Sequence, residues 1–258
     1  GVLRAPARCA RGRGPARQLT WFDALTPDFK TIHPLGAQLA LECIAIMSPT
    51  FLSPRFHTTY HVPTYQDWLE RQDLRPAYRF HRRFLQQLQW RTPARRWVLK
   101  APAHLFAFDA LLETYPDARI VQTHRDPTTV LASVASLTAV LQRAFTDHFD
   151  PYEIGHEVSR RWTNGLDRAM RLRQSGRVAA ERFFDVHYHD LLRDPMMVIR
   201  RIYAHFDVPL TEEASVAMRG FLAANPKDKH GAHRYSLSSF GLEADDLVRR
   251  FKAYREYY

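Results

Sequence analysis

Hydrophobic and polar positions follow helical spacing through the first third of this chain. Apolar residues recur every three or four positions over residues 21–47 and again over residues 63–88, which predicts amphipathic helices. Residues 31–34 interrupt the first stretch and Pro76 the second, because proline ends or restarts a helix. The N-terminal third is therefore predicted to consist of helices.

The pattern changes after residue 96, where short apolar runs alternate with helical segments. Runs at 97–99, 119–123 and 182–188 have the length and composition of strands. Helical spacing is present over residues 105–115, 128–145, 152–173, 195–206, 212–223 and 243–257. Alternation of strands and helices is typical of a parallel sheet. The pattern predicts an α/β fold with a short parallel sheet and many helices.

Composition adds a basic N-terminal arm to this picture. The chain has 258 residues, 45% of them hydrophobic and 25% charged, which fits one large globular domain or two small ones. Half of the net charge of +10 comes from five arginines in residues 1–18, a stretch without acids that indicates a disordered arm or an irregular start. No basic run with interleaved aromatic residues follows, so nucleic acid is not an expected partner. A mild basic balance suits a small polyanionic ligand.

The cysteines and the apolar stretches indicate a cytoplasmic protein. Cys9 and Cys43 are the only cysteines, so a disulfide framework is not expected. The sequence shows neither an apolar stretch long enough to span a membrane nor a secretory signal. It also has no compact metal-binding motif such as His-Glu-x-x-His, so no metal is expected.

Two loops occupy the place where parallel sheets bind ligands, after the carboxyl ends of strands. One runs from Lys100 to His104, and the other is the His-Arg-Asp-Pro segment at 124–127. Arg125 offers a fork of donors suited to phosphate, and the helix that follows opens with free N–H groups. Ser133 lies two turns into that helix. This arrangement predicts an anion site, although pairing of Arg125 with Asp126 explains the pattern equally well.

A third candidate segment is the long loop over residues 225–241. It carries the cationic residues Lys227, Lys229, His230, His233 and Arg234. Long ordered loops rich in cations usually serve a ligand. The alternative is a solvated surface excursion without a ligand.

Four segments in order make the chain recognisable: residues 97–105, residues 116–127 followed by Ser133, residues 188–195 and residues 229–236. Together they resemble the sulfotransferase family, in particular its bacterial branch, over about residues 25–258. The resemblance implies a P-loop-like, three-layer α/β fold. It also implies a co-substrate, 3′-phosphoadenosine 5′-phosphosulfate, whose sulfuryl group passes to an acceptor hydroxyl or amine.

The resemblance also implies roles in donor binding. Arg125 and Ser133 match the family's arginine and serine that hold the 3′-phosphate. A second phosphate contact would come from Lys229, His230 and Gly231. Tyr188 stands where family members bring an aromatic ring near the adenine, although a core tyrosine at a strand end is the alternative.

At the reaction centre, Lys100 matches a catalytic lysine and His104 lies near the family's catalytic histidine. Family members place that histidine two residues after the lysine, whereas here the spacing is four. His33 and His61 are alternatives for the general base. Sulfuryl transfer needs a cation for the charge on the leaving phosphate and a base for the acceptor proton.

The resemblance has one departure, at the start of the chain. Family members open with a strand and a loop of the type Gly-x-Pro-Arg-Thr-Gly-Thr-Thr, which cradles the 5′-phosphosulfate. Here the first residues are Gly-Val-Leu-Arg-Ala-Pro-Ala, without the hydroxyls. We therefore expect the N-terminal strand, loop and helix to be missing, and the sequence does not determine whether the chain is active. The alternative function is a non-catalytic nucleotide-binding or interaction protein; a P-loop kinase ranks last, because Gly-x-x-x-x-Gly-Lys-Ser/Thr is absent.

The expected organisation is a basic arm at 1–18 followed by a sulfotransferase-like domain at 19–258. Within that domain, residues 19–95 form a helical substrate-side region and residues 96–258 the nucleotide-binding core. The expected partner is a small-molecule acceptor. Neither the acceptor nor the oligomeric state is determined by the sequence.

Overall fold

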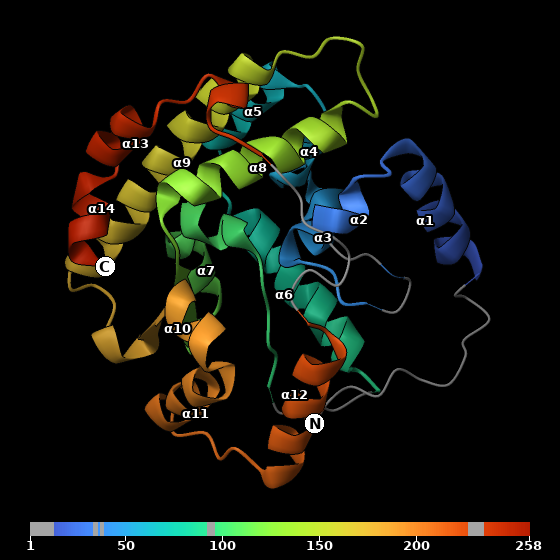
Figure 1. Ribbon diagram of the computed structural model, residues 1–258. Coiled ribbons are helices and arrows are strands. Elements are labelled where there is room, and N and C mark those ends of the chain that lie inside the picture. The colour runs from blue at the N-terminus through green and yellow to red at the C-terminus, as the bar shows by residue number, and fades with distance from the viewer. Residues whose placement is uncertain (1–12, 33–35, 37–38, 92–95, 227–234) are drawn as a thin grey trace.

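The computed structural model describes residues 13–32, 36, 39–91, 96–226 and 235–258. Helices surround a small parallel sheet (Figure 1). The α-helices are α1 (Arg13–Leu25), α2 (Phe29–Ile32), α3 (Cys43–Met47), α4 (Arg55–Thr59), α5 (Pro63–Glu70), α6 (Arg75–Gln89), α7 (Phe108–Thr114), α8 (Pro127–Gln142), α9 (Pro151–Gln174), α10 (Tyr188–Arg193), α11 (Pro195–His205), α12 (Glu212–Ala224), α13 (Ala244–Arg250) and α14 (Lys252–Tyr257). Short 3₁₀ turns are η2 (Ser48–Thr50), η3 (Pro102–Phe106), η4 (Ala180–Arg182) and η5 (Ser238–Phe240).

The sheet consists of β1 (Ile120–His124) and β2 (Phe183–His187) within the described ranges. The strands are parallel, with Ile120 opposite Phe183 and His124 opposite His187. Both strands therefore end at the same edge. The residue after β1 and the residue after β2 lie at that edge, where parallel sheets bind ligands.

The main core lies between α8 and α9, the two longest helices. Leu131, Ala135 and Ala139 of α8 cluster with buried residues of α9, including Ile154 and Val158. The alanines recur every four residues and leave room for the neighbouring helix. On α9, a side chain at Gly155 would overlap the carbonyl oxygen of Phe240. This packing holds α8 in place behind the carboxyl end of β1.

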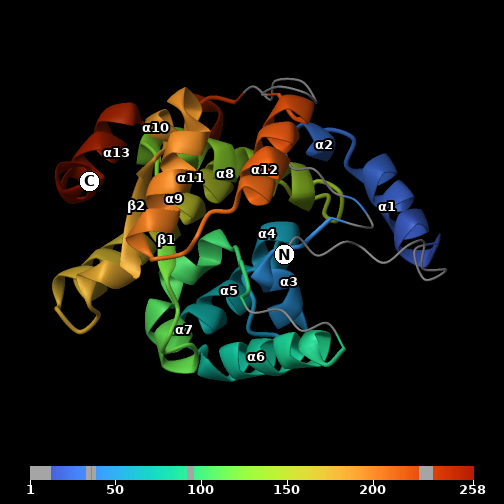
Figure 2. The same cartoon turned by 90° about the horizontal axis from the view of Figure 1, so that it is seen from below.

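A second cluster joins the N-terminal helices to α7. Tyr78 and Ala77 of α6 pack with Met47, Ala107 and Ala110. Figure 2 shows α6 and α7 on one side of the molecule and α10 and α11 on the other. The strands thus lie among helices on both sides of the molecule, and the fold is mostly helical α/β, as the pattern predicts.

The structure differs from the sequence expectation at residues 97–99 and in the N-terminal arm. Residues 97–99 do not form a strand, and Val98 is 94% exposed. A strand exists only when a partner satisfies its backbone groups, and no described segment pairs with these residues. The apolar run alone could not show this. In addition, α1 begins at Arg13, so the described part of the arm at 1–18 is helical rather than irregular.

Beyond residue 105 most elements follow the predicted ranges closely, but α4 and α10 lie where no helix is predicted, and residues 31–32, predicted as part of a break, belong to α2. Pro76 lies in the first turn of α6, where the helical pattern restarts after α5 ends at Glu70, because proline is tolerated in a first helical turn. The segment expected over residues 243–257 consists of two helices, α13 and α14. Over the part of the chain that is described, each helix is too short or too polar to cross a membrane.

Candidate functional site

Arg125 and Tyr188 meet at the carboxyl edge of the sheet. They directly follow β1 and β2, and the parallel register brings them side by side. The Arg125 guanidinium carbon lies 4.4 Å from the centre of the Tyr188 ring. This cation–π contact orients the guanidinium without neutralising it.

Arg125 keeps its charge available to a ligand. It is exposed and forms no ion pair with any residue that the structure describes. Asp126, which the sequence offers as its alternative partner, instead lies 3.4 Å from Arg255. The Asp126 carboxylate also accepts hydrogen bonds from the Thr128 backbone N–H at 2.8 Å and from the Thr128 hydroxyl at 2.6 Å. The pairing alternative is therefore not what the structure shows.

The opening of α8 differs from expectation. The sequence predicts that the first turn presents free N–H groups to an anion, but Asp126 accepts hydrogen bonds from these groups. Its carboxylate accepts from Thr128, and its carbonyl oxygen accepts from Thr129 and Val130, each at 3.1 Å. A capping aspartate satisfies these donors and adds a negative charge. An anion at this edge must therefore be bound mainly by side chains rather than by the backbone N–H groups of α8.

Ser133 is the other expected 3′-phosphate contact. It lies on α8 and is half-buried. At about 1.5 Å per residue, it stands about 9 Å along the helix from its start. Lys229, His230 and Gly231 lie outside the described residues, as do His33 and the segment Gly1–Ala7. The roles expected for them stay predictions.

Lys100 contacts a carboxylate that no sequence motif marks. Its ammonium group forms an ion pair with Glu42, which lies just before α3. The backbone N–H of Cys43 donates to the Lys100 carbonyl at 3.1 Å, so backbone and side chains join the same two segments. Glu42 is mostly buried, whereas Lys100 is exposed. The available signal was a single acid within the apolar stretch 39–47.

His104 lies in η3, four residues after Lys100, and is held by a tyrosine. Its Nδ1 lies 2.7 Å from the Tyr78 hydroxyl. Burial lowers the pKa of His104 to about 4, and the nearby His81 adds to the shift. Burial also raises the pKa of Tyr78, so this hydroxyl keeps its proton. His104 is therefore neutral at pH 7, and Nε2 can accept a proton when Nδ1–H donates to Tyr78.

A buried polar network supports the carboxyl edge from behind. His124 contacts Asp185 through Nε2 and the Tyr254 hydroxyl through Nδ1, both at 2.7 Å. The Arg173 guanidinium binds both oxygens of Asp185, at 2.5 and 2.7 Å. Gln122 accepts a further bond from Arg173 at 3.0 Å. The network joins β1, β2, α9 and α14 next to Arg125.

Asp185 is the centre of this network, and its removal is expected to destabilise the fold. Burial would raise the pKa of Asp185, but hydrogen bonds from His124 and Arg173 and the charge of Arg173 outweigh burial and hold that pKa far below its usual range. Asp185→Asn leaves the Arg173 charge without its partner. Because Asp185 is about one-third exposed, we expect a loss of about 2 kcal/mol in the free energy of unfolding.

Urea denaturation of wild type and variant measures this loss. The stabilisation requires an ionised Asp185, so it is fully present above the unfolded pKa of about 3.9 and declines as the pH falls below it. Glu256→Gln removes an exposed ion pair with Lys252 and is the matched control, expected to change stability by less than about 0.5 kcal/mol. Equal stability of wild type and Asp185→Asn at pH 7 contradicts a structural role.

Comparison with known proteins relates this geometry to a family. The profile described as "Sulfotransferase family" matches residues 4–212. Two curated relatives, named omega-hydroxy-beta-dihydromenaquinone-9 sulfotransferase Stf3, from Mycobacterium bovis and Mycobacterium tuberculosis, are each 27% identical over 190 residues. The match covers 68% of this chain and 46% of each relative, so the chain spans about half the length of these curated relatives.

Solved structures agree with this relationship. The crystal structure of sulfotransferase STF1 from Mycobacterium tuberculosis is 36% identical, with a TM-score of 0.79 over 93% of this chain and 62% of that one. Sulfotransferase STF9 from Mycobacterium avium is 31% identical, also with a TM-score of 0.79, over 98% of this chain and 67% of that one.

Proposed function

Because this chain belongs to the sulfotransferase family, we propose that it moves a sulfuryl group from 3′-phosphoadenosine 5′-phosphosulfate to an acceptor hydroxyl or amine. The single observation that carries the proposal is the Arg125–Tyr188 pair at the carboxyl edge of the sheet. It supplies an accessible cation and an aromatic ring on neighbouring strand ends. These groups suit the phosphate and the base of a nucleotide.

In this proposal Arg125 binds the 3′-phosphate of the donor. A guanidinium donates two parallel hydrogen bonds to phosphate oxygens, which gives both affinity and orientation. The Ser133 hydroxyl adds a neutral donor, and Lys229, His230 and Gly231 complete the phosphate contact. The Tyr188 ring positions Arg125 and lies near the adenine. Since the α8 opening is capped by Asp126, Arg125 supplies most of the attraction at this edge.

Lys100 is the proposed cation of the reaction centre. An acceptor oxygen attacks sulfur in line, the bond between sulfur and the leaving phosphate oxygen breaks, and the acceptor proton goes to a base. Lys100 neutralises the charge that develops on the leaving phosphate. To reach the donor its ammonium must leave or share Glu42. The products are a sulfated acceptor and 3′-phosphoadenosine 5′-phosphate.

Two side chains are candidates for the base. His104 has an accepting nitrogen at Nε2 when Nδ1–H donates to Tyr78. Glu42 is a carboxylate in direct contact with Lys100, and a carboxylate next to the catalytic cation also accepts a proton. The sequence resemblance favours His104, and the contact with Lys100 adds Glu42 as the second candidate.

A hydroxyl is the first acceptor class to test. The curated relatives are named as sulfotransferases of omega-hydroxy-beta-dihydromenaquinone-9. By analogy, the proposal includes a hydroxyl acceptor for this chain. The second candidate function is nucleotide binding without transfer. It is favoured by the ion pair that engages Lys100 with Glu42.

Calorimetric titration and a transfer assay separate these functions. The full chain is titrated with 3′-phosphoadenosine 5′-phosphate and, as a matched ligand, with adenosine 5′-phosphate, which lacks the 3′-phosphate. We expect at least about tenfold tighter binding of the first, because one charge-assisted phosphate contact contributes about 1.5–3 kcal/mol. Equal affinities contradict the 3′-phosphate site. Release of 3′-phosphoadenosine 5′-phosphate in the presence of a hydroxyl acceptor supports transfer, whereas binding without release supports the second candidate.

A further inference from the structure

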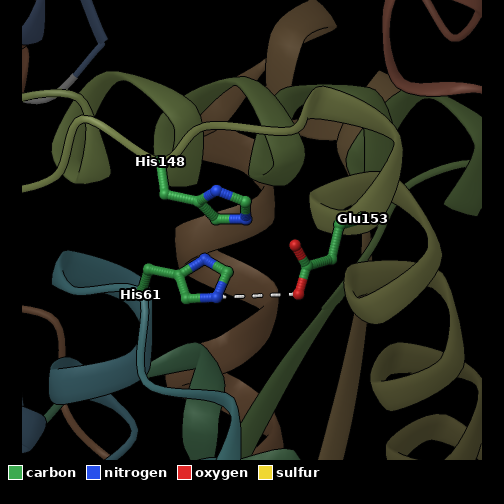
Figure 3. Close-up of side chains that lie close together, drawn as sticks. All are labelled: His61, His148 and Glu153. Atoms are coloured by element: carbon green, nitrogen blue, oxygen red, sulfur yellow. Dashed lines mark ion pairs between the residues drawn. The ribbon is translucent and has the colours of Figure 1, made fainter.

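Three side chains of types that ligate metals converge in space. They come from parts of the sequence other than those that carry Arg125 and Lys100. His61 lies between α4 and α5, His148 between α8 and α9, and Glu153 in the first turn of α9. Figure 3 shows the two imidazole rings one above the other, with the Glu153 carboxylate beside them. The three side chains point toward a shared space.

Their spacing fits one bound ion better than direct hydrogen bonds. His61 Nε2 lies 3.7 Å from Glu153 Oε1, which is too long for a hydrogen bond. One ligand atom from each residue lies within 4.8 Å of the other two. In a tetrahedral zinc site with bonds of about 2.1 Å, neighbouring ligand atoms stand roughly 3.4 Å apart. Small side-chain rotations are enough to close the remaining gap.

The backbone around the ligands is held by its own hydrogen bonds. The His148 N–H donates to the Thr146 hydroxyl oxygen at 3.1 Å, and that hydroxyl donates to the His148 carbonyl at 3.2 Å. Asp150 caps α9 and accepts from the N–H groups of Tyr152 and Glu153. The turn that carries His148 and the helix start that carries Glu153 are therefore ordered before any ion binds.

A small cavity with some polar lining adjoins the cluster. His61 and Glu153 line a cavity of about 50 Å³ together with His57 and Arg161. Both ring nitrogens of His57 and the Nε of Arg161 are enclosed and have no hydrogen-bond partner among the described residues. Enclosed polar atoms of this kind are normally satisfied by water or a ligand. The cavity thus offers room for the water that completes a site with three protein ligands.

We propose that His61, His148 and Glu153 bind one divalent transition-metal ion of the zinc type, with water as the fourth ligand. Two imidazoles and one carboxylate are the donor set that zinc prefers over calcium or magnesium, which take oxygen ligands. The ion joins the start of α5 to the start of α9. The sequence shows no compact motif for it because His61 lies far along the chain from His148 and Glu153.

Metal titration of the full chain tests the site. The protein, without an affinity tag and stripped with a chelator, is titrated with Zn²⁺ by calorimetry, and the visible spectrum of the Co²⁺ complex reports coordination geometry. We expect one tight site in the wild type and at least about tenfold weaker binding in His61→Ala, His148→Ala and Glu153→Gln, in line with the cost of disturbing metal ligands. His156→Ala removes an exposed histidine of α9 outside the group and is the control, expected to bind as the wild type does.

The outcome does not depend on transferase activity. The proposal is overturned if the three variants bind Zn²⁺ as tightly as the wild type does. It is also overturned if the Co²⁺ spectrum stays that of the hydrated ion. Thermal unfolding in the presence of chelator identifies any variant that fails to fold. If a variant does not fold, the Co²⁺ spectrum of the wild type decides whether the site binds a metal ion. Zn²⁺ is also expected to raise the melting temperature of the wild type and of His156→Ala, but not that of the three ligand variants, because a ligand that binds only the folded state stabilises it.

Discussion

Arg125→Ala is expected to weaken the binding of 3′-phosphoadenosine 5′-phosphate by about a hundredfold, since a hydrogen-bonded charged contact contributes about 1.5–3 kcal/mol. Arg125 is accessible, oriented by the Tyr188 ring and free of ion pairs within the described part of the chain. The helix opening beside it is occupied by Asp126. Calorimetric titration measures the change.

The matched control for this variant is Arg201→Ala. Arg201 is also exposed, and its guanidinium lies over the ring of Phe184 in β2 at 5.8 Å. Arg201 is also an arginine that lies over an aromatic ring, but it is not part of the proposed site. The affinity of Arg201→Ala for 3′-phosphoadenosine 5′-phosphate should therefore stay unchanged. Arg125→Lys should fall between wild type and alanine, because lysine keeps the charge and loses the fork. Unchanged affinity in Arg125→Ala contradicts the assignment of the 3′-phosphate.

Lys100→Met is expected to lower the rate of sulfuryl transfer by about a thousandfold while leaving affinity for 3′-phosphoadenosine 5′-phosphate within a few fold. Removing one group that stabilises developing charge typically costs about 10²–10³ in rate. Methionine keeps much of the apolar stem and removes only the ammonium group. Single-turnover measurement with saturating donor and a hydroxyl acceptor reports the chemical step.

Lys252→Met is the control for Lys100→Met. Lys252 is exposed and pairs with Glu256 on α14, so its loss should leave the rate unchanged. Lys100→Arg should restore part of the rate, since it keeps a cation next to Glu42. A rate in Lys100→Met equal to that of the wild type excludes Lys100 from the reaction centre. Thermal unfolding separates a catalytic loss from destabilisation caused by the unpaired Glu42.

Parts of the candidate site could be predicted from local sequence. Arg125 and Tyr188 each follow an apolar run that forms a strand, and the sequence places both at strand ends. Their contact depends on the parallel register, which a strand–helix–strand order favours. Residues 97–99, predicted as a strand, do not form one, and no described segment pairs with them. A strand depends on its neighbour, whereas a helix satisfies its own backbone.

Other parts required the folded chain. Glu42 carries no motif, and its contact with Lys100 joins segments far apart in the sequence. The capping of α8 by Asp126 is a local feature that aspartate before proline favours, although the spacing also offers Asp126 as a partner for Arg125. The network around Asp185 likewise combines residues of four elements. Spacing along the chain does not encode such contacts.

The sequence by itself determined most helices, the two strands and the family, because hydrophobic periodicity and short ordered motifs are local properties of a chain. Tertiary structure decided which polar groups are paired. It left Arg125 accessible, engaged Lys100 with Glu42, lowered the pKa of His104 by burial, and brought His61, His148 and Glu153 together. The physical reason is that charge, solvation and coordination depend on distances in space, and those distances are set only when the helices pack.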